Sequence, residues 1–90
     1  MEVQHKETES KGSFYIGDPV LAEMTYSKAG DSLIIIDHTE VRDALKGKGV
    51  GLQLVKAAVE FARNKKVKIL PLCPFAKSVF DKKEELRDVL

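Results

Sequence analysis

The chain has few of the residues that stabilise small secreted scaffolds. It holds one cysteine among 90 residues, so it cannot form an internal disulfide, and we expect a reducing compartment and a cytoplasmic protein. It has no tryptophan, 3 prolines and 6 glycines, which excludes collagen-like and proline-rich compositions. The longest apolar run, Leu33 to Ile36, is far shorter than the ~20 residues that cross a bilayer. The acidic, polar segment 1–10 is also unlike a signal peptide, so we expect no membrane partner.

The composition is sufficient for a hydrophobic core, at 43% hydrophobic and 32% charged residues. We therefore expect residues 1–90 to form a single domain that folds alone. The net charge is +1, but the charges are unevenly distributed along the chain. Residues 1–40 carry 3 basic and 8 acidic side chains, whereas residues 41–70 carry 8 basic and 2 acidic side chains. The basic middle of the chain suits a phosphate-bearing ligand better than a long nucleic acid. A solvated, lysine-rich helix face explains the same charge equally well.

The first half of the chain has the pattern of antiparallel strands. Residues 20–27 alternate in polarity, and residues 32–41 are rich in β-branched side chains. The turn-forming sequence Lys28-Ala29-Gly30-Asp31 separates them, which predicts a hairpin. Residues 13–16 are expected to supply a partner strand.

The period changes after residue 50. Apolar residues then recur at helical spacing, which predicts a helix from Val50 to about Lys66; they are Leu54, Val55, Ala58, Phe61 and Ala62. Residues 67–72 read as a strand, and the intervening helix makes it parallel to its neighbour. Residues 74–81 and 84–89 are expected to be helical.

A glycine-rich segment, KGKGVG, connects the last strand of the hairpin to the long helix. Helix N-termini present unpaired N–H groups, and glycine lets an anion approach them closely, so the segment is typical of a phosphate site. The Gly-Lys pair, Gly47-Lys48, is followed by Gly49 and not by Ser or Thr, which excludes the Walker A loop, and Leu52 breaks the G-x-G-x-x-G pattern. A plain helix-entry turn is the alternative.

At this point the residues resemble a known family. KGKGVG followed by LQLVKAAVEFA is similar to the coenzyme A pyrophosphate loop and helix of the GNAT superfamily of N-acetyltransferases, whose signature is Q/R-x-x-G-x-G/A. Lys46 stands at the Gln/Arg position, and Gly49 and Gly51 stand at the two glycines. A second family pattern, N-x-x-A-x-x-x-Y-x-K, is matched by residues 73–82 with Cys73 in place of Asn and Phe80 in place of Tyr. The resemblance covers about residues 32–82.

The resemblance implies a fold and an activity. The fold is a mixed α/β (α+β) sheet, with antiparallel strands plus one parallel strand after the long helix. It is truncated relative to the full fold, which has two helices after its first strand and two further strands at the end. The activity is transfer of an acetyl group from acetyl-CoA, the cosubstrate, to an amine. The acceptor is left open among a protein lysine, an N-terminus and a polyamine, with no specific nucleic acid partner.

The sequence allows two other functions. A non-catalytic acyl-CoA binding module is favoured by Phe80 and by the missing strands that would wall an acceptor site. A small nucleic-acid binder is disfavoured, because few aromatic residues lie among the lysines of the basic segment.

The resemblance also assigns coenzyme-binding residues. The loop would hold the pyrophosphate, and the end of the preceding strand would contact pantetheine through its backbone. The residues are Thr39, Val41, Lys46, Gly47, Lys48, Gly49, Val50 and Gly51.

The catalytic residues expected are Cys73 and His38. Phe80 has no hydroxyl, so the proton donor usual in the family is missing. Cys73 precedes Pro74 at the predicted N-cap of a helix, where a thiolate is stabilised, and it is expected to act as proton donor or as nucleophile. A buried, inert cysteine is the alternative. An imidazole can accept a proton near neutral pH, so His38 is the candidate base, although a structural histidine at a strand end is equally consistent.

Simple strand alternation places His38 and Glu40 on one face and Asp37 and Thr39 on the other. The second histidine, His5, lies in the polar N-terminal stretch and carries no functional signal. Two histidines and one cysteine at scattered positions do not have the spacing of metal ligands, so no metal site is expected.

Overall fold

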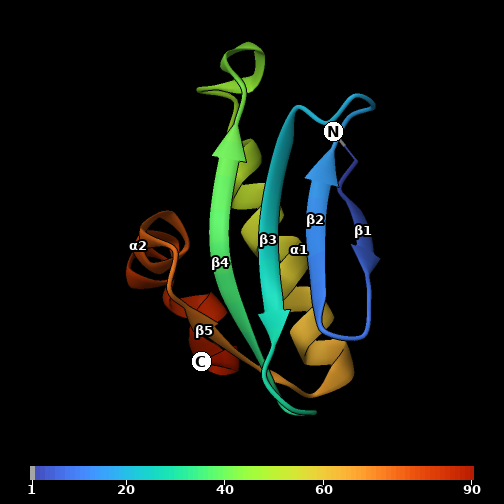
Figure 1. Cartoon of the computed structure of the whole chain (residues 1–90). Coiled ribbons are helices and arrows are strands. Elements are labelled where there is room, and N and C mark those ends of the chain that lie inside the picture. Colours follow the sequence, from blue (N-terminus) through green and yellow to red (C-terminus); the bar gives the residue numbers. More distant parts are fainter. Residues whose placement is uncertain (1) are drawn as a thin grey trace.

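A five-stranded mixed sheet forms the centre of the structure, a computed structural model that describes residues 2–90. Strands β1 (Gln4–Glu7), β2 (Lys11–Ile16), β3 (Ala22–Lys28) and β4 (Leu33–Val41) pair in sequence order as an antiparallel meander. Strand β5 (Lys68–Pro71) pairs with β4 in parallel and lies at the edge (Figure 1). The hairpin, its partner strand and the parallel strand predicted from the sequence are thereby confirmed.

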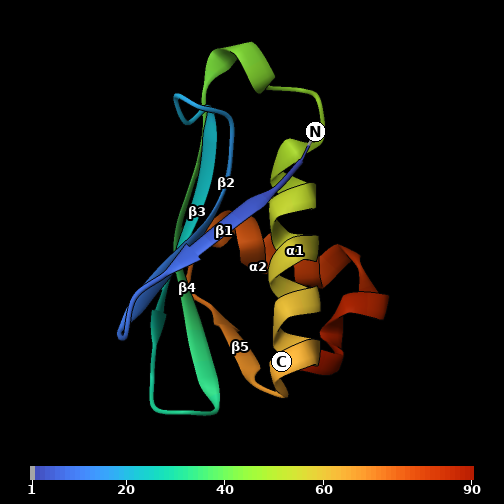
Figure 2. The ribbon, with the colours of Figure 1, turned by 90° about the vertical axis from the view of Figure 1, so that its right-hand side faces the viewer.

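The helices follow β4. A 3-10 turn, η1 (Asp43–Leu45), leads to helix α1 (Val50–Lys65), which makes the crossover to β5. Helix α2 (Pro74–Lys82) and the 3-10 helix η2 (Glu84–Val89) end the chain. Figure 2 shows α1 and α2 on the same side of the sheet, so neither α-helix covers the opposite face. We call that uncovered surface the open face. No helix within residues 2–90 is long and apolar enough to span a membrane.

The core lies between the sheet and α1. Residues with no more than 1% exposure come from both layers, among them Met24 and Ile36 of the sheet and Leu54, Val55 and Ala58 of α1. The helical spacing seen in the sequence therefore does mark the buried face of α1. Burying a side chain of this size contributes about 1.5–3 kcal/mol, so this face of α1 is held mainly by packing.

Strand β1 was not predicted, because QHKE contains no apolar residue. Besides its ladder with β2, the strand is anchored at the edge of the core by the side chain of His5. The His5 ring stacks on Phe14 with 4.3 Å between centroids and meets Phe61 of α1 edge-on at 4.7 Å. His5 Nε2 also lies 2.7 Å from the hydroxyl of the buried Tyr26. No functional signal was assigned to His5 from the sequence, and the structure gives its ring a role in packing.

Strand β4 contains a bulge at Asp37. In the pairing with β3, Thr25 lies opposite His38 and Tyr26 lies opposite Ile36, so Asp37 is the extra residue. A bulge shifts the alternation of side chains by one residue. Asp37 consequently shares the open face with His38 and accepts a 2.6 Å hydrogen bond from Ser27. The prediction that Asp37 and Thr39 share a face was wrong for this reason.

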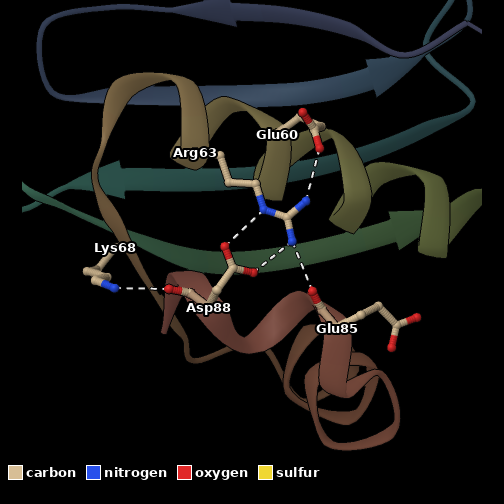
Figure 3. Close-up of polar contacts among 5 residues, drawn as sticks. All are labelled: Glu60, Arg63, Lys68, Glu85 and Asp88. Atoms are coloured by element: carbon tan, nitrogen blue, oxygen red, sulfur yellow. Dashed lines mark hydrogen bonds and ion pairs between the residues drawn. The ribbon is translucent and has the colours of Figure 1, made fainter.

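The C-terminal segment is fastened to α1 by one arginine (Figure 3). Arg63 donates from Nε and Nη2 to the two carboxylate oxygens of Asp88, at 3.0 and 2.7 Å, and from Nη1 to Glu60 at 3.1 Å. Arg63 Nη2 also donates to the Glu85 carbonyl at 2.9 Å, and Lys68 donates to the Asp88 carbonyl at 3.0 Å. In the same segment, the side chains of Leu86 and Val89 are buried in the core. The predicted helix over 84–89 is present as a 3-10 helix.

Candidate functional site

The two parallel strands separate at Ile36. Their last ladder pair is Ile36 with Pro71, and the Ile36 carbonyl then accepts hydrogen bonds of 3.1 Å from both Leu72 and Cys73. Beyond this point β4 continues to Val41, whereas the other chain turns away into α2. The separation opens a cleft between the end of β4, the start of α1 and α2.

The cleft has a volume of about 470 Å³. Its lining residues come from β4, the glycine-rich loop, the first turn of α1, and α2 with the residue after it; they are Thr39, Val41, Leu45, Lys46, Gly47, Gly49, Val50, Gly51, Leu52, Phe75, Val79, Lys82 and Lys83. Seven of the eight predicted coenzyme-binding residues are therefore brought together. Lys48, the eighth, is exposed and does not line the cleft.

The loop reaches α1 through left-handed glycines. Gly47 has φ +79° and Gly49, the N-cap residue of α1, has φ +73°. The Gly49 carbonyl accepts a hydrogen bond from the Gln53 N–H at 3.2 Å, which is the first hydrogen bond of the helix. The N–H groups before Gln53, in the first turn that lines the cleft, therefore have no acceptor within the helix. A 16-residue helix places the positive end of its dipole there. This end of the cleft is suited to an anion.

Gly51 is needed for a different reason from Gly49. It is buried in the first turn of α1, and a Cβ at this position would come within 2.5 Å of the Phe75 ring. The absence of a side chain allows α2 to pack against α1 and lets Phe75 form part of the cleft wall. Gly51 therefore shapes the cleft through packing, whereas Gly49 provides a backbone conformation.

All charged side chains that line the cleft are lysines: Lys46, Lys82 and Lys83. Lys46 lies on the loop and pairs with Asp43 at 3.1 Å. Lys82 and Lys83 come from the end of α2 and the residue after it, and neither was among the predicted binding residues. Their signal was obscured because three carboxylates, Glu84, Glu85 and Asp88, follow within the same segment. The cleft thus presents positive charge from both walls.

Cys73 lies at the N-cap of α2, and its side chain is buried. It does not line the cleft but lies beside it, in contact with the lining residue Thr39. Its Sγ is 3.3 Å from Thr39 Oγ1. Burial raises the pKa of the thiol, but the hydrogen bond with Thr39 and the backbone N–H groups of Ala76, Phe75 and Thr39 outweigh it, so the net pKa is lowered. These N–H groups lie near the sulfur, although the side chain forms no full capping hydrogen bond with them.

His38 points away from the cleft. It lies on the open face, with its Nε2 3.8 Å from a carboxylate oxygen of Glu40, and its side chain is 69% exposed. The predicted pairing of His38 and Glu40 on one face is confirmed. Cys73 and His38 therefore lie on opposite sides of β4, with the strand edge between them. Within residues 2–90, no three His, Cys, Asp or Glu side chains gather as a metal-binding group.

The cleft combines three kinds of surface along its length. Backbone N–H groups and lysines lie at one end, an apolar wall that includes Val41, Leu45 and Val79 forms the middle, and Thr39 with Cys73 closes the other end. Such a cleft fits an elongated ligand with phosphate at one end and a largely apolar arm.

Comparisons with known proteins agree with this geometry. The model of the GCN5-related N-acetyl-transferase family matches residues 13–89. Protein NATD1 of Homo sapiens is 35% identical over 52 residues, which is 58% of this chain and 46% of that protein. Protein NATD1 of Gallus gallus shows the same identity over the same length, covering 47% of its sequence. The chain thus matches less than half the length of these relatives.

Solved structures extend the comparison to the whole fold. A GCN5-like protein of Staphylococcus aureus, determined in solution by NMR, is 45% identical, with a TM-score of 0.75 over 96% of this chain and 85% of that one. The ribosomal-protein-alanine N-acetyltransferase of Brucella melitensis biovar Abortus shares the fold at 13% identity, with a TM-score of 0.69 over 83% of this chain and 62% of that one. The chain belongs to the GCN5-related N-acetyltransferase family.

Proposed function

We propose that the protein binds acetyl-CoA in the cleft and transfers its acetyl group to an amine. One observation carries this proposal: a single cleft is lined by the glycine-rich N-terminus of α1, by three lysines and by Thr39, which contacts Cys73. The first turn of α1 and Lys46, Lys82 and Lys83 would hold the phosphates. A more distant structural neighbour, AAC(6')-Iy, was solved with a bisubstrate analogue that contains CoA.

The strand end would orient the thioester arm. The backbone of Thr39 and Val41 has no further strand beside it where β5 turns away, so its N–H and C=O groups are available to the amide groups of pantetheine. The thioester sulfur would then lie near the Ile36 carbonyl and Cys73.

Transfer requires a base and an acid. His38, on the open face, would accept a proton from the attacking amine. As the carbon–nitrogen bond forms, the carbon–sulfur bond breaks, and Cys73 would give its proton to the departing thiolate. The lowered pKa of Cys73 favours this role. In the alternative, Cys73 attacks the thioester itself and carries the acetyl group before the amine takes it.

A non-catalytic acyl-CoA binding module remains the second candidate, on one specific observation. Phe80, which replaces the family tyrosine, is 1% exposed and belongs to the core, so α2 offers no hydroxyl at that position. Catalysis would then rest on Cys73 alone as the acid.

Two measurements separate these functions. Isothermal titration with acetyl-CoA and with CoA tests binding, and thioester consumption with a panel of amines tests transfer. The proposal expects saturable binding, consumption above the blank, and a fall in consumption for His38→Ala with binding unchanged. Tight binding without turnover across the panel supports the binding module. Failure to bind either ligand would contradict both.

A further inference from the structure

The open face of the sheet carries a hollow of about 810 Å³, separate from the cleft. The residues that line it come from β1 to β4 and from the turn between β1 and β2. Its floor is formed by the side chains of β2 and β3 that point away from α1, such as Ser13 and Thr25, which are paired across the two strands. No α-helix closes this face (Figure 2).

Ser13 provides evidence that the hollow is made for a ligand. Its side chain is buried, at 4% exposure, and its hydroxyl oxygen has no hydrogen-bond partner within residues 2–90. Leaving a buried polar group unpaired costs about 1–3 kcal/mol, and such groups are rare in folded proteins. Because Ser13 lines the hollow, a molecule bound there would supply the missing partner.

Glu7 of β1 lines the hollow but is paired with Lys28 at 3.1 Å, and the other charged side chains around the hollow are separated by sign. Asp37 of β4 and Glu23 of β3 lie on one side, and Lys6 of β1 and Lys11 of β2 lie on the other. Within residues 2–90 none of these four side chains forms an ion pair. Neighbouring strands are ~4.8 Å apart, so the step from β4 to β2 spans about 10 Å. The hollow thus offers uncompensated charges of opposite sign about 10 Å apart.

The acidic side of the hollow adjoins the narrow end of the cleft. Asp37 follows Ile36, the residue at which β4 and β5 separate, and Thr39 lines the cleft from the other face of the same strand. An amine held by Asp37 would therefore lie at the strand edge where the thioester is expected.

Resting on the function proposed above, we propose that the hollow binds the acceptor and that the acceptor is amphoteric. Its amine would lie at Asp37, and an acidic group about 10 Å away would lie at Lys11, which is paired with Ser27, the hydrogen-bond donor to Asp37. The Ser13 hydroxyl would pair with a polar group between these ends. A short peptide with a free amino terminus and a carboxylate has this chemistry, whereas a polyamine would place positive charge against Lys11.

Triglycine tests the proposal, since its two termini are its only charges and three extended residues span about 10 Å. Binding is followed by backbone amide chemical shifts of the protein alone and of the protein with CoA. We expect triglycine to shift the amides around Ser13, Thr25 and Asp37. We also expect it to bind at least about fivefold more tightly than triglycine amide, which corresponds to about 1 kcal/mol. Lys11→Met should reduce this preference.

Lys77→Met is the matched control, since it removes an exposed lysine on α2 that does not line the hollow. It should leave the preference unchanged. Equal binding of triglycine and its amide, tighter binding of spermidine than of triglycine, or shifts confined to the cleft would overturn the proposal. Acetyl-CoA is titrated separately. If triglycine binds in the hollow but acetyl-CoA does not bind, the proposed function is contradicted. If acetyl-CoA binds but triglycine does not, only the amphoteric acceptor is contradicted.

Discussion

Cys73 and Thr39 meet across the point where β4 and β5 part, with 3.3 Å between Cys73 Sγ and Thr39 Oγ1. The contact joins residues 34 positions apart in sequence and closes the end of the cleft. The Thr39 hydrogen bond is also the largest of the influences that lower the pKa of Cys73.

The first prediction concerns this contact. Thr39→Val keeps the shape of the side chain and removes the hydroxyl, so the pKa of Cys73 should rise. The pH profile of Cys73 alkylation should then move to higher pH, since the thiolate is the reacting form. Thr25→Val, which removes a hydroxyl from the open face, should leave the profile unchanged. A Thr39→Val profile that coincides with wild type would show that the hydrogen bond does not control the thiol.

A second prediction compares two glycines with the same backbone conformation. Gly49 and Gly30 both have φ +73°, and a Cβ at either would have no heavy atom within 4 Å. Gly49→Ala and Gly30→Ala should each lower the free energy of unfolding by about 1 kcal/mol, which is the strain of a left-handed alanine.

Only Gly49→Ala should also weaken acetyl-CoA binding, by about tenfold, because Gly49 presents the first turn of α1 to the cleft. Thermal unfolding and isothermal titration measure the two effects. Equal affinities for the two variants would mean that the loop is only a turn.

The lysines of α2 give a third prediction. Lys82→Ala should weaken acetyl-CoA binding about threefold to fivefold at low ionic strength, as expected for one exposed ionic contact, and the difference should shrink in 1 M salt. Lys77 lies on the same helix and does not line the cleft, so Lys77→Ala is the matched control. If both variants lose affinity equally, the effect is one of net charge and the lysine wall has no specific role.

A fourth prediction concerns pH and stability. Burial lowers the pKa of His5 below 6.5. Glu7 raises this pKa by a smaller amount, and Lys28 lowers it slightly further. The folded state therefore binds fewer protons than the unfolded state, and this contribution to stability is present above about pH 6.5 and is lost as the pH falls below it.

Unfolding of His5→Gln should accordingly depend less on pH between pH 8 and 5 than unfolding of wild type. His38→Gln, at the exposed histidine, should retain the wild-type dependence. The reverse assignment, with His38→Gln flattening the curve, would contradict the role given to His5 in β1.

Much of the fold follows from sequence because its signals are local. The β4–α1–β5 unit was predicted since Leu54, Val55 and Ala58 recur at helical spacing between two strands of β-branched residues. Strand β1 was not predicted because its four residues are polar and its stability depends on Phe14 and Phe61, which are distant in sequence.

The candidate site was predictable only in part. The glycine-rich loop has a sequence pattern, so the phosphate end of the cleft could be placed. The bulge at Asp37 leaves no clear signal, and it places Thr39 on the face opposite to that of Asp37, where simple alternation would put the two on the same face. Lys82 and Lys83 reach the cleft only because α2 packs against α1 through Gly51 and Phe75, a contact between segments that local patterns do not reveal.

The most direct test of the account is to map acetyl-CoA onto the protein by backbone amide chemical shifts. Saturable changes should centre on the amides of Gly49, Val50 and Gly51 and extend through Thr39 to Cys73, with the residues around Ser13 little affected. Acetyl-CoA that causes no shifts at millimolar concentration, or shifts that centre on the open face and leave the glycine-rich loop unchanged, would contradict the assignment of the cleft as the acetyl-CoA site.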